Sequence, residues 1–218
     1  DRQRAQHALA LDYLKAGLLD RAEAALLKLE GTPFETQAQL ALLANYERSR
    51  DWTHAAQIAQ KLELSKQGNF SGRLAHYLCE KASVCIANKE YIQARSLLEE
   101  AINTAPAAPR PRIDLASMFN DQGQPEDAYR TLEKSFQSTR TALPLIAGPF
   151  AQYAIGSMHV PQALELLKTS YEQSPSLDVL DAIVALEATL TGPSPTARDW
   201  YVRHLEHEPS LVAAAKWI

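Results

Sequence analysis

Cysteine is scarce in this chain, which limits the kinds of site the chain can build. Only Cys79 and Cys85 occur among the 218 residues. They are six positions apart in one predicted helix, a separation of about 600° around the helix axis, so their side chains point to different faces. A disulfide between them is not expected. Two isolated cysteines are typical of a reducing compartment or of buried apolar positions.

The chain also lacks an excess of charge of either sign. It carries 22 basic and 26 acidic residues, a formal net charge of −4. Without a positive field, it is not expected to bind nucleic acid or an anionic membrane surface. Familiar catalytic motifs are missing as well, since the sequence contains no glycine-rich phosphate loop, GxSxG, HExxH or paired CxxC. We therefore predict no catalytic residues and no enzymatic activity.

No long apolar run is present. The chain opens on four polar residues, so no signal peptide is expected. Between residues 140 and 165 there is no Asp, Glu, Lys or Arg, but prolines and glycines interrupt that segment. A membrane-spanning helix needs about 20 mostly apolar residues. The segment therefore predicts a buried pair of helices.

What the sequence does contain is a repeat. Alanines at similar places in a recurring pattern are spaced by 33, 39, 34, 35 and 34 residues, and they are Ala22, Ala55, Ala94, Ala128, Ala163 and Ala197. The tetratricopeptide repeat has a period of about 34 residues. The spacing predicts an all-α fold, a right-handed superhelical solenoid of about six helix-turn-helix units.

Each unit has the same order of residue types. An aromatic or apolar residue is followed by a short polar turn, then by the alanine, then by apolar residues four and seven positions later. The first residues of the pattern are Tyr13, Tyr46, Cys85, Phe119 and Ala154, and the turn residues are Gly17, Asp51, Lys89, Gly123 and His159. A small side chain is expected where the second helix crosses the first, because only then can the two backbones approach closely.

We predict a single solenoid over residues 1–218. Its approximate units are 3–35, 36–70, 74–107, 109–142, 143–176 and a degenerate 177–210. The one long interval has a visible cause, since residues 65–72 are polar, contain two glycines and predict a longer connection. The last residues, 210–218, resemble the opening of a further helix, so the chain is expected to be a piece of a longer protein.

Histidines and acids suggest two further sites, neither of which we favour. His76, Cys79 and Glu80 share one helical face at i, i+3 and i+4, but a metal site needs three or four ligands and no fourth is close in sequence. We predict packed side chains and no metal. His204 and His207 also share a face, and we expect them to be solvated in a charged final helix.

The surface most suited to function is the concave side of the solenoid, which the first helix of each unit lines. The inward positions mix charged, amide and apolar side chains, which suits a peptide or a protein flank. The predicted partner-binding residues are Arg4, His7, Leu11, Gln37, Glu47, His76, Arg110, Ile113, Asn120 and Gln152.

Two runs of residues resemble a known family. The run from Tyr13 to Glu23 and the run from Ala75 to Ala82 are similar to stretches of the bacterial lipopolysaccharide assembly protein B family. The second run is the more specific, because its His-x-x-Cys-Glu sequence has no role in the repeat consensus. The order of the two runs and the long connection between them also fit the family.

The resemblance implies an adaptor on the cytoplasmic face of the inner membrane of a Gram-negative bacterium. Members carry an N-terminal membrane helix, a repeat array and a C-terminal rubredoxin-like knuckle that holds iron or zinc through two CxxC pairs. By resemblance, the adaptor links a membrane-bound ATP-dependent protease to the lipid A precursor deacetylase, and so regulates proteolysis and lipopolysaccharide synthesis. It would contact other lipopolysaccharide assembly proteins, and a homo-oligomer is compatible with this. No cofactor is expected within these 218 residues.

Two alternatives remain open at this point. The chain could be a generic tetratricopeptide scaffold in another envelope, pilus or secretion assembly. It could also be an enzyme or metal protein whose site is scattered in sequence, for example one that binds metal through Cys79.

Overall fold

The computed structural model describes residues 2–138, 142–192 and 196–207, together with positions 209, 212, 214 and 215. These residues form helices and connections, and no strand occurs among them. The chain divides into two compact units, Asp1–Ala105 and Pro106–Ile218. The predicted all-α tetratricopeptide-repeat fold is confirmed. A single right-handed solenoid over the whole chain stays a prediction, and each unit is described by itself.

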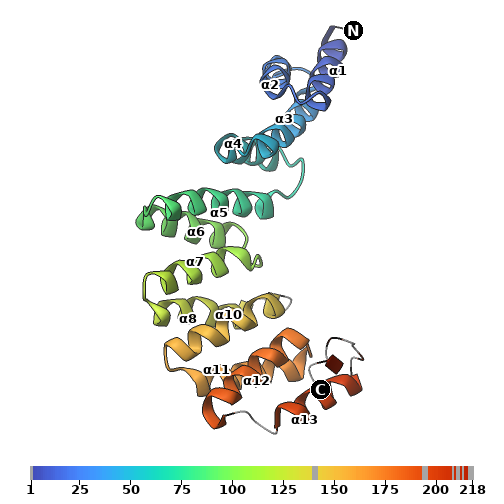
Figure 1. The fold of residues 1–218 in the computed structure, drawn as a ribbon. Coiled ribbons are helices and arrows are strands. Elements are labelled where there is room, and N and C mark those ends of the chain that lie inside the picture. Colours follow the sequence, from blue (N-terminus) through green and yellow to red (C-terminus); the bar gives the residue numbers. More distant parts are fainter. Residues whose placement is uncertain are drawn as a thin grey trace. The chain divides into compact units, whose positions relative to one another are not determined.

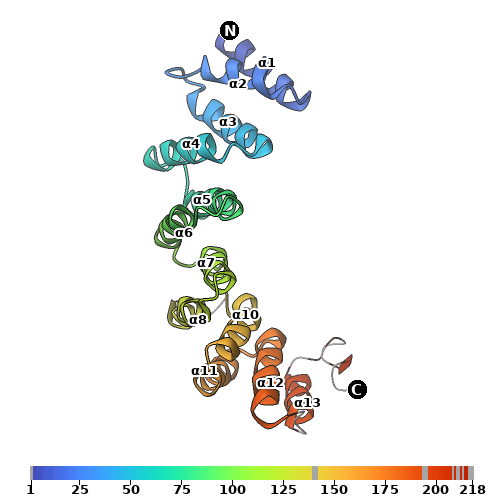
Figure 2. The ribbon, with the colours of Figure 1, turned by 60° about the vertical axis from the view of Figure 1, so that its left-hand side comes forward.

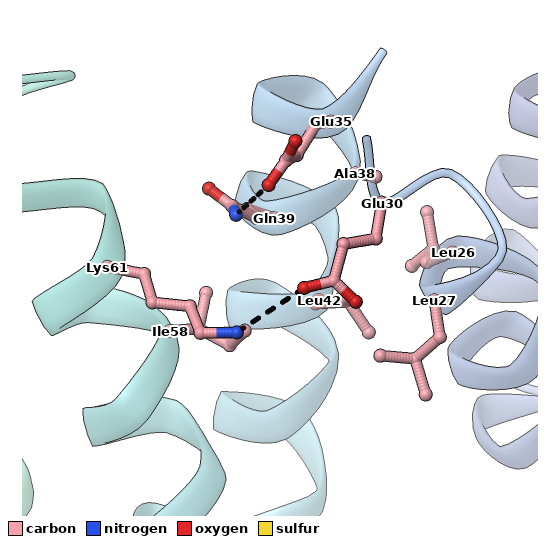
Figure 3. Close-up of a pocket in the computed structure, with 9 residues that line it drawn as sticks. All are labelled: Leu26, Leu27, Glu30, Glu35, Ala38, Gln39, Leu42, Ile58 and Lys61. Atoms are coloured by element: carbon pink, nitrogen blue, oxygen red, sulfur yellow. Dashed lines mark hydrogen bonds and ion pairs between the residues drawn. The ribbon is translucent and has the colours of Figure 1, made fainter. Parts of the chain in front are cut away.

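Unit 1 contains three helix pairs, each joined by a short turn (Figures 1 and 2). The pairs are α1 (Arg2–Lys15) with α2 (Leu19–Leu27), α3 (Glu35–Ser49) with α4 (Trp52–Leu64), and α5 (Ser71–Ala87) with α6 (Tyr91–Thr104). Helix α3 lies between α2 and α4 (Figure 3). The connection before α5, residues 65–70, is shorter than residues 28–34 before α3, so the predicted longer connection is wrong. The 39-residue alanine interval instead reflects the longer helices α4 and α5, of 13 and 17 residues.

Unit 2 also contains three pairs and one short extra helix. The helices are α7 (Arg110–Asp121), α8 (Pro125–Glu133), α9 (Ser135–Ser138), α10 (Leu143–Gly156), α11 (Val160–Gln173), α12 (Leu177–Thr191) and α13 (Thr196–His207). The charge-free segment forms α10 and the start of α11, where Ile146, Ala147 and Phe150 are fully buried. The predicted helix pair is present but only partly buried, since Leu145 and Met158 are 63% and 88% exposed. Among the described residues, no helix has both the length and the hydropathy to cross a bilayer. Most of residues 208–218 lie outside the described part.

The repeat alanines explain how the helices of a pair approach each other. Ala22, Ala55, Ala94, Ala128 and Ala163 all have 0% exposure. Each lies on the second helix of its pair, where a larger side chain would have no room. In the degenerate sixth pair, Ala197 is only half-buried, so the close crossing is made in five pairs and is looser in α13.

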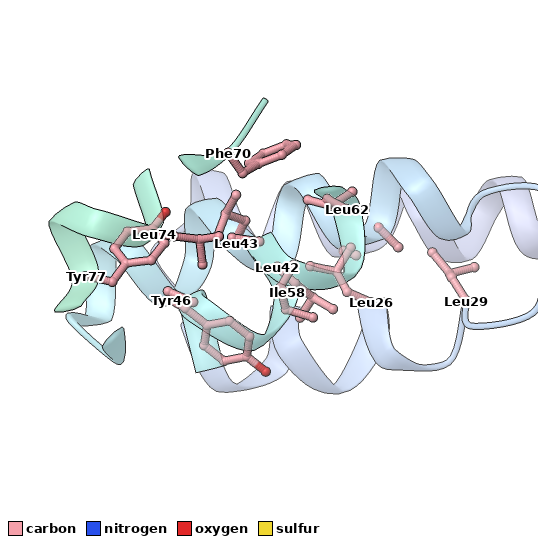
Figure 4. Close-up of a cluster of buried hydrophobic side chains, with 14 of the residues drawn as sticks. Leu26, Leu29, Leu42, Leu43, Tyr46, Ile58, Leu62, Phe70, Leu74 and Tyr77 are labelled. Carbon is pink, nitrogen blue, oxygen red and sulfur yellow. The ribbon is translucent and has the colours of Figure 1, made fainter. Parts of the chain in front are cut away.

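Larger apolar side chains fill the space between neighbouring pairs. In unit 1 they form one cluster from α2 to α5 (Figure 4). Leu26, Leu43 and Leu62 are at most 1% exposed within it, and Tyr77 of α5 closes one end. Every helix in this cluster therefore buries its apolar face against its neighbours in the chain, as expected for repeats that cannot fold alone.

Every turn within the first five pairs has the same backbone geometry. One residue per turn is left-handed, with φ between 57° and 74°, and these residues are Gly17, Arg50, Lys89, Gly123 and Met158. The next residue donates its N–H to the carbonyl five positions earlier, at 2.8–2.9 Å. That acceptor is always the first residue of the sequence pattern: Tyr13, Tyr46, Cys85, Phe119 or Ala154. This is the Schellman arrangement, which satisfies carbonyls that a helix end would leave unpaired. Two of the turn residues expected from the sequence, Asp51 and His159, lie one position after the left-handed residue.

Two substitutions test the energetic role of these turns. Met158→Gly is expected to raise the free energy of unfolding by about 0.5–1 kcal/mol, because a left-handed conformation costs a non-glycine residue about 1–2 kcal/mol. Met158 is 88% exposed, so little packing is lost. Gly123→Ala should lower stability by a similar amount, since an added Cβ there meets nothing within 4 Å and only the φ of 74° is strained. Urea unfolding of both variants measures the change in the free energy of unfolding. If that change has the same sign in both variants, the left-handed conformation does not set the stability of these turns.

Candidate partner-binding surfaces

All ten residues predicted to bind a partner lie on the first helix of a pair. Arg4, Gln37, His76 and Gln152 are exposed, whereas His7, Leu11, Glu47, Arg110, Ile113 and Asn120 are half-buried. In unit 1 they occupy α1, α3 and α5, and in unit 2 they occupy α7 and α10. These positions leave each side chain with accessible surface. Their role in binding stays a prediction.

Glu47 and His76 are brought together around Tyr77. The Tyr77 hydroxyl donates a hydrogen bond to Glu47 Oε1 and so joins α5 to α3. The Arg73 guanidinium lies 3.9 Å from the same oxygen. Glu47 thus helps to hold two neighbouring pairs together, and its carboxylate is partly engaged before any partner arrives.

The imidazole of His76 belongs to an aromatic group. Its ring centroid is 5.7 Å from that of Trp52, with the planes at 81°, and Trp52 stacks on Tyr77 at 5.9 Å. Edge-to-face and stacked rings at these separations attract each other by about 0.5–1.5 kcal/mol. We call Glu47, Trp52, Arg73, His76 and Tyr77 the α5 cluster. It combines a carboxylate with a guanidinium and aromatic rings, and arginine and aromatic side chains are enriched at protein interfaces.

The motif residues beside His76 have different environments. Cys79 is 1% exposed and Glu80 is half-buried, whereas His76 is exposed. Cys79 and Cys85 are both free and buried in α5, and burial raises the pKa of the Cys85 thiol. A thiol with a raised pKa is a poor nucleophile and a poor metal ligand at neutral pH. Within the described residues, no group of three or more His, Cys, Asp and Glu side chains is placed to hold a metal ion.

Tyrosine hydroxyls bonded to acidic side chains recur in both units. Tyr46 donates to Glu23 at 2.7 Å, Tyr129 to Glu133 at 3.1 Å and Tyr201 to Asp181 at 2.8 Å, and Tyr77 donates to Glu47. Three of these bonds join different helices. Sequence reasoning missed them, because partners 20 or more residues apart leave no local pattern.

These bonds predict a loss of stability at high pH. Burial and the hydrogen bond to Glu133 raise the pKa of Tyr129 to about 12, and burial with a neighbouring acid raises the pKa of Tyr46, Tyr77 and Tyr201 further. An unfolded tyrosine ionises near pH 10. The unfolded chain therefore loses protons first, so the free energy of unfolding should fall as the pH rises above about 10.

Urea unfolding across that pH range measures the effect, with tyrosinate absorbance as the second observable. Tyr129→Phe should make the fall in the free energy of unfolding with rising pH less steep. A free energy of unfolding that stays constant from about pH 9 to 12 would contradict the assignment.

One expectation about histidine is wrong. His204 is not solvated but only 1% exposed. Its Nδ1 lies 2.7 Å from the Tyr171 hydroxyl, so α13 packs its histidine against α11. The charged residues of the final helix led to the expectation of a solvated histidine, whereas the partner that buries His204 is 33 positions earlier. The side chain of His207 lies outside the described residues.

Helices α2, α3 and α4 enclose a small hollow (Figure 3). Leu27, Leu42 and Ile58 line it, and an ion pair of 3.7 Å between Lys61 and Glu30 crosses its mouth. Its volume is about 40 Å³, whereas pockets for small molecules usually have about 300–1,000 Å³. The hollow is therefore a packing feature of unit 1 and not a small-molecule site.

Comparison with known proteins supports the resemblance seen in the sequence. No family model matches the chain. The chain is 32% identical over 130 residues to lipopolysaccharide assembly protein B of Haemophilus influenzae, which covers 59% of this chain and 33% of that protein. It is 27% identical over 166 residues to the protein of the same name from Escherichia coli K12, which covers 76% of this chain and 38% of that protein.

The resemblance to lipopolysaccharide assembly protein B is confirmed. The chain spans about a third of the length of these curated relatives. The similarity therefore concerns a part of lipopolysaccharide assembly protein B and not its whole length.

Solved structures include similar helical repeats. A tetratricopeptide protein from Cytophaga hutchinsonii has a TM-score of 0.49 at 13% identity, over 92% of this chain and 78% of that one. The pilF protein of Pseudomonas aeruginosa has a TM-score of 0.46 at 21% identity, over 99% and 96% of the two chains. Both scores lie below 0.5, so the assignment of the fold depends on the helix pairs and turns described above.

Proposed function

We propose that this chain is the interaction region of an adaptor for lipopolysaccharide assembly. The observation that carries the proposal is the similarity to lipopolysaccharide assembly protein B of two bacteria. The fold agrees with it, because stacked helix pairs present extended surfaces that bind proteins. No catalytic group is needed for such a role.

The finer proposal is that the adaptor links an inner-membrane ATP-dependent protease to the deacetylase that commits precursors to lipid A. The chain would then act at the cytoplasmic face of the inner membrane. The α5 cluster is the first contact surface to test, since it contains the motif around His76 and exposes the ring of His76 and the guanidinium of Arg73. An iron or zinc knuckle would need CxxC pairs, which Cys79 and Cys85 in α5 do not form. No step of the proposal therefore uses a metal.

Immunoprecipitation of the tagged full-length protein from its own bacterium tests the proposal. Blots for the protease and the deacetylase should both be positive. A combined Arg73→Ala and His76→Ala variant should recover at least about fivefold less of one partner, since interface arginines and aromatic groups often contribute more than 1 kcal/mol. Gln93→Ala, an exposed change on α6, is the matched control and should recover both partners as the parent does.

Three results would count against the proposal or a part of it. Recovery of neither partner by the parent protein would overturn the link between protease and deacetylase. If deletion of the protein leaves lipopolysaccharide levels unchanged while a pilus or secretion assembly fails, the generic scaffold is the better description. Unchanged recovery by the double variant would overturn the α5 cluster as the contact surface.

A further inference from the structure

Unit 2 contains a groove between the first helices of its last two pairs. Helices α10 and α12 pack side by side (Figures 1 and 2). The groove between them has a volume of about 390 Å³, within the range of about 300–1,000 Å³ that ligand sites occupy. Helix α10 supplies one wall and α12 the other, and every lining residue belongs to these two helices.

The side chains that line the groove are mostly small or apolar. Gly148 and Ala185 are exposed and Ala182 is buried, while Leu145 is 63% exposed. An exposed leucine beside a floor without large side chains gives a partner's apolar side chain both a contact and room to enter. The groove therefore favours a ligand that supplies a large apolar side chain.

The groove contains hydrogen-bond acceptors but no side-chain donor. Its lining side chains are those of Pro144, Leu145, Gly148, Pro149, Ala151, Asp178, Asp181, Ala182 and Ala185. None of them has an N–H or O–H group at neutral pH. Pro149 also lies inside α10 and has no N–H, so the Leu145 carbonyl loses its usual helical donor. A bound segment must therefore supply the donors.

The charge of the groove is negative. Helix α10 contains no charged residue, and α12 contains Asp178, Asp181 and Glu187 but no Lys or Arg. Glu187 is engaged by Lys168 at 2.7 Å, and Asp181 accepts the Tyr201 hydroxyl. Asp178 is exposed and has no ion-pair partner among the described residues. A cation brought by a ligand would meet this carboxylate beside Leu145.

We propose that the groove between α10 and α12 binds a protein segment in which an apolar side chain lies next to arginine or lysine. The proposal deepens the proposed function and rests on it, because it states the chemistry of one partner segment. The apolar side chain packs against Leu145 and the small floor. The cation pairs with Asp178 and donates hydrogen bonds to the acceptors of the groove.

Peptide binding to the whole chain tests this proposal. Three fluorescein-labelled peptides of equal length are compared by anisotropy at physiological ionic strength: one of leucine and arginine, one of leucine and glutamate, and one of serine and arginine. The leucine–arginine peptide should bind most tightly. Asp178→Lys should weaken it at least about tenfold, because an attraction becomes a repulsion at an interface of intermediate dielectric. Leu145→Ser should weaken it at least about threefold.

Asp20→Lys is the matched control. Asp20 is likewise an exposed acid in the first turn of its helix, but it belongs to α2 of unit 1 and does not line the groove. Binding by this variant should equal that of the parent. Equal losses of peptide affinity in Asp20→Lys and Asp178→Lys would show a general charge effect and would contradict binding in the groove. Equal affinity of the parent for all three peptides would also contradict it. The protease and deacetylase blots test the proposed function separately. If the blots are positive but the peptides do not bind as expected, only the proposal about the groove is rejected.

Discussion

Replacing Phe150 by alanine is expected to lower the free energy of unfolding by about 3–5 kcal/mol, the usual cost of removing a buried aromatic ring. Phe150 is fully buried in α10. Its ring centroid lies 5.0 Å from that of Tyr129, on which it stacks, and 4.6 Å from that of Phe136. The one ring of Phe150 therefore holds α10 to α8 and α9. The variant leaves a cavity between helices that cannot collapse without moving the backbone.

Hydrogen exchange measured along the chain shows where the stability is lost. Protection should fall in α8 and α10, the helices that share the ring. Ile155→Ala, on the same helix but 44% exposed, serves as the control and should change stability much less. If the two variants unfold at the same urea concentration, Phe150 does not hold these helices together.

Replacing Ala94 by leucine is expected to cost about 1–3 kcal/mol, because extra methylenes in a well-packed core force neighbouring side chains and backbone to move. Ala94 has 0% exposure where α6 crosses α5. Ala197→Leu is the matched change at the equivalent place in the sixth pair, where the residue is half-buried, and should cost less. Urea unfolding of the two variants compares them. A larger cost at Ala197 would mean that the repeat alanines do not set the helix spacing.

The helix pairs could be predicted because their cause is local and periodic. The alanine of each pair must be small, and the apolar residues that follow it recur at helical spacing, so a pattern within about 34 residues carries the information. The turns could be placed only to within one residue. Glycine identifies the left-handed position at Gly17 and Gly123, but Arg50 and Met158 adopt the same conformation without any compositional signal.

The candidate sites were less accessible to sequence reasoning. The predicted first-helix positions do lie on first helices, but the bonds that position Glu47 come from Tyr77, 30 residues later. His204 is buried by Tyr171, 33 residues earlier. The groove between α10 and α12 depends on which faces of two helices meet. The missing charges between residues 140 and 165 were visible in the sequence, but they indicated only burial and not an acceptor-lined groove.

Within each unit, helices pack mainly on those that precede and follow them in the chain. Contacts that are local in sequence close only short loops, so each unit should fold rapidly compared with sheet proteins of similar size. Opening can also be local: one pair can unfold while the pairs beside it keep their structure. For the proposed adaptor, this allows a terminal pair to detach and reattach during an encounter. The distance over which the adaptor captures a partner is then not fixed by its folded dimensions.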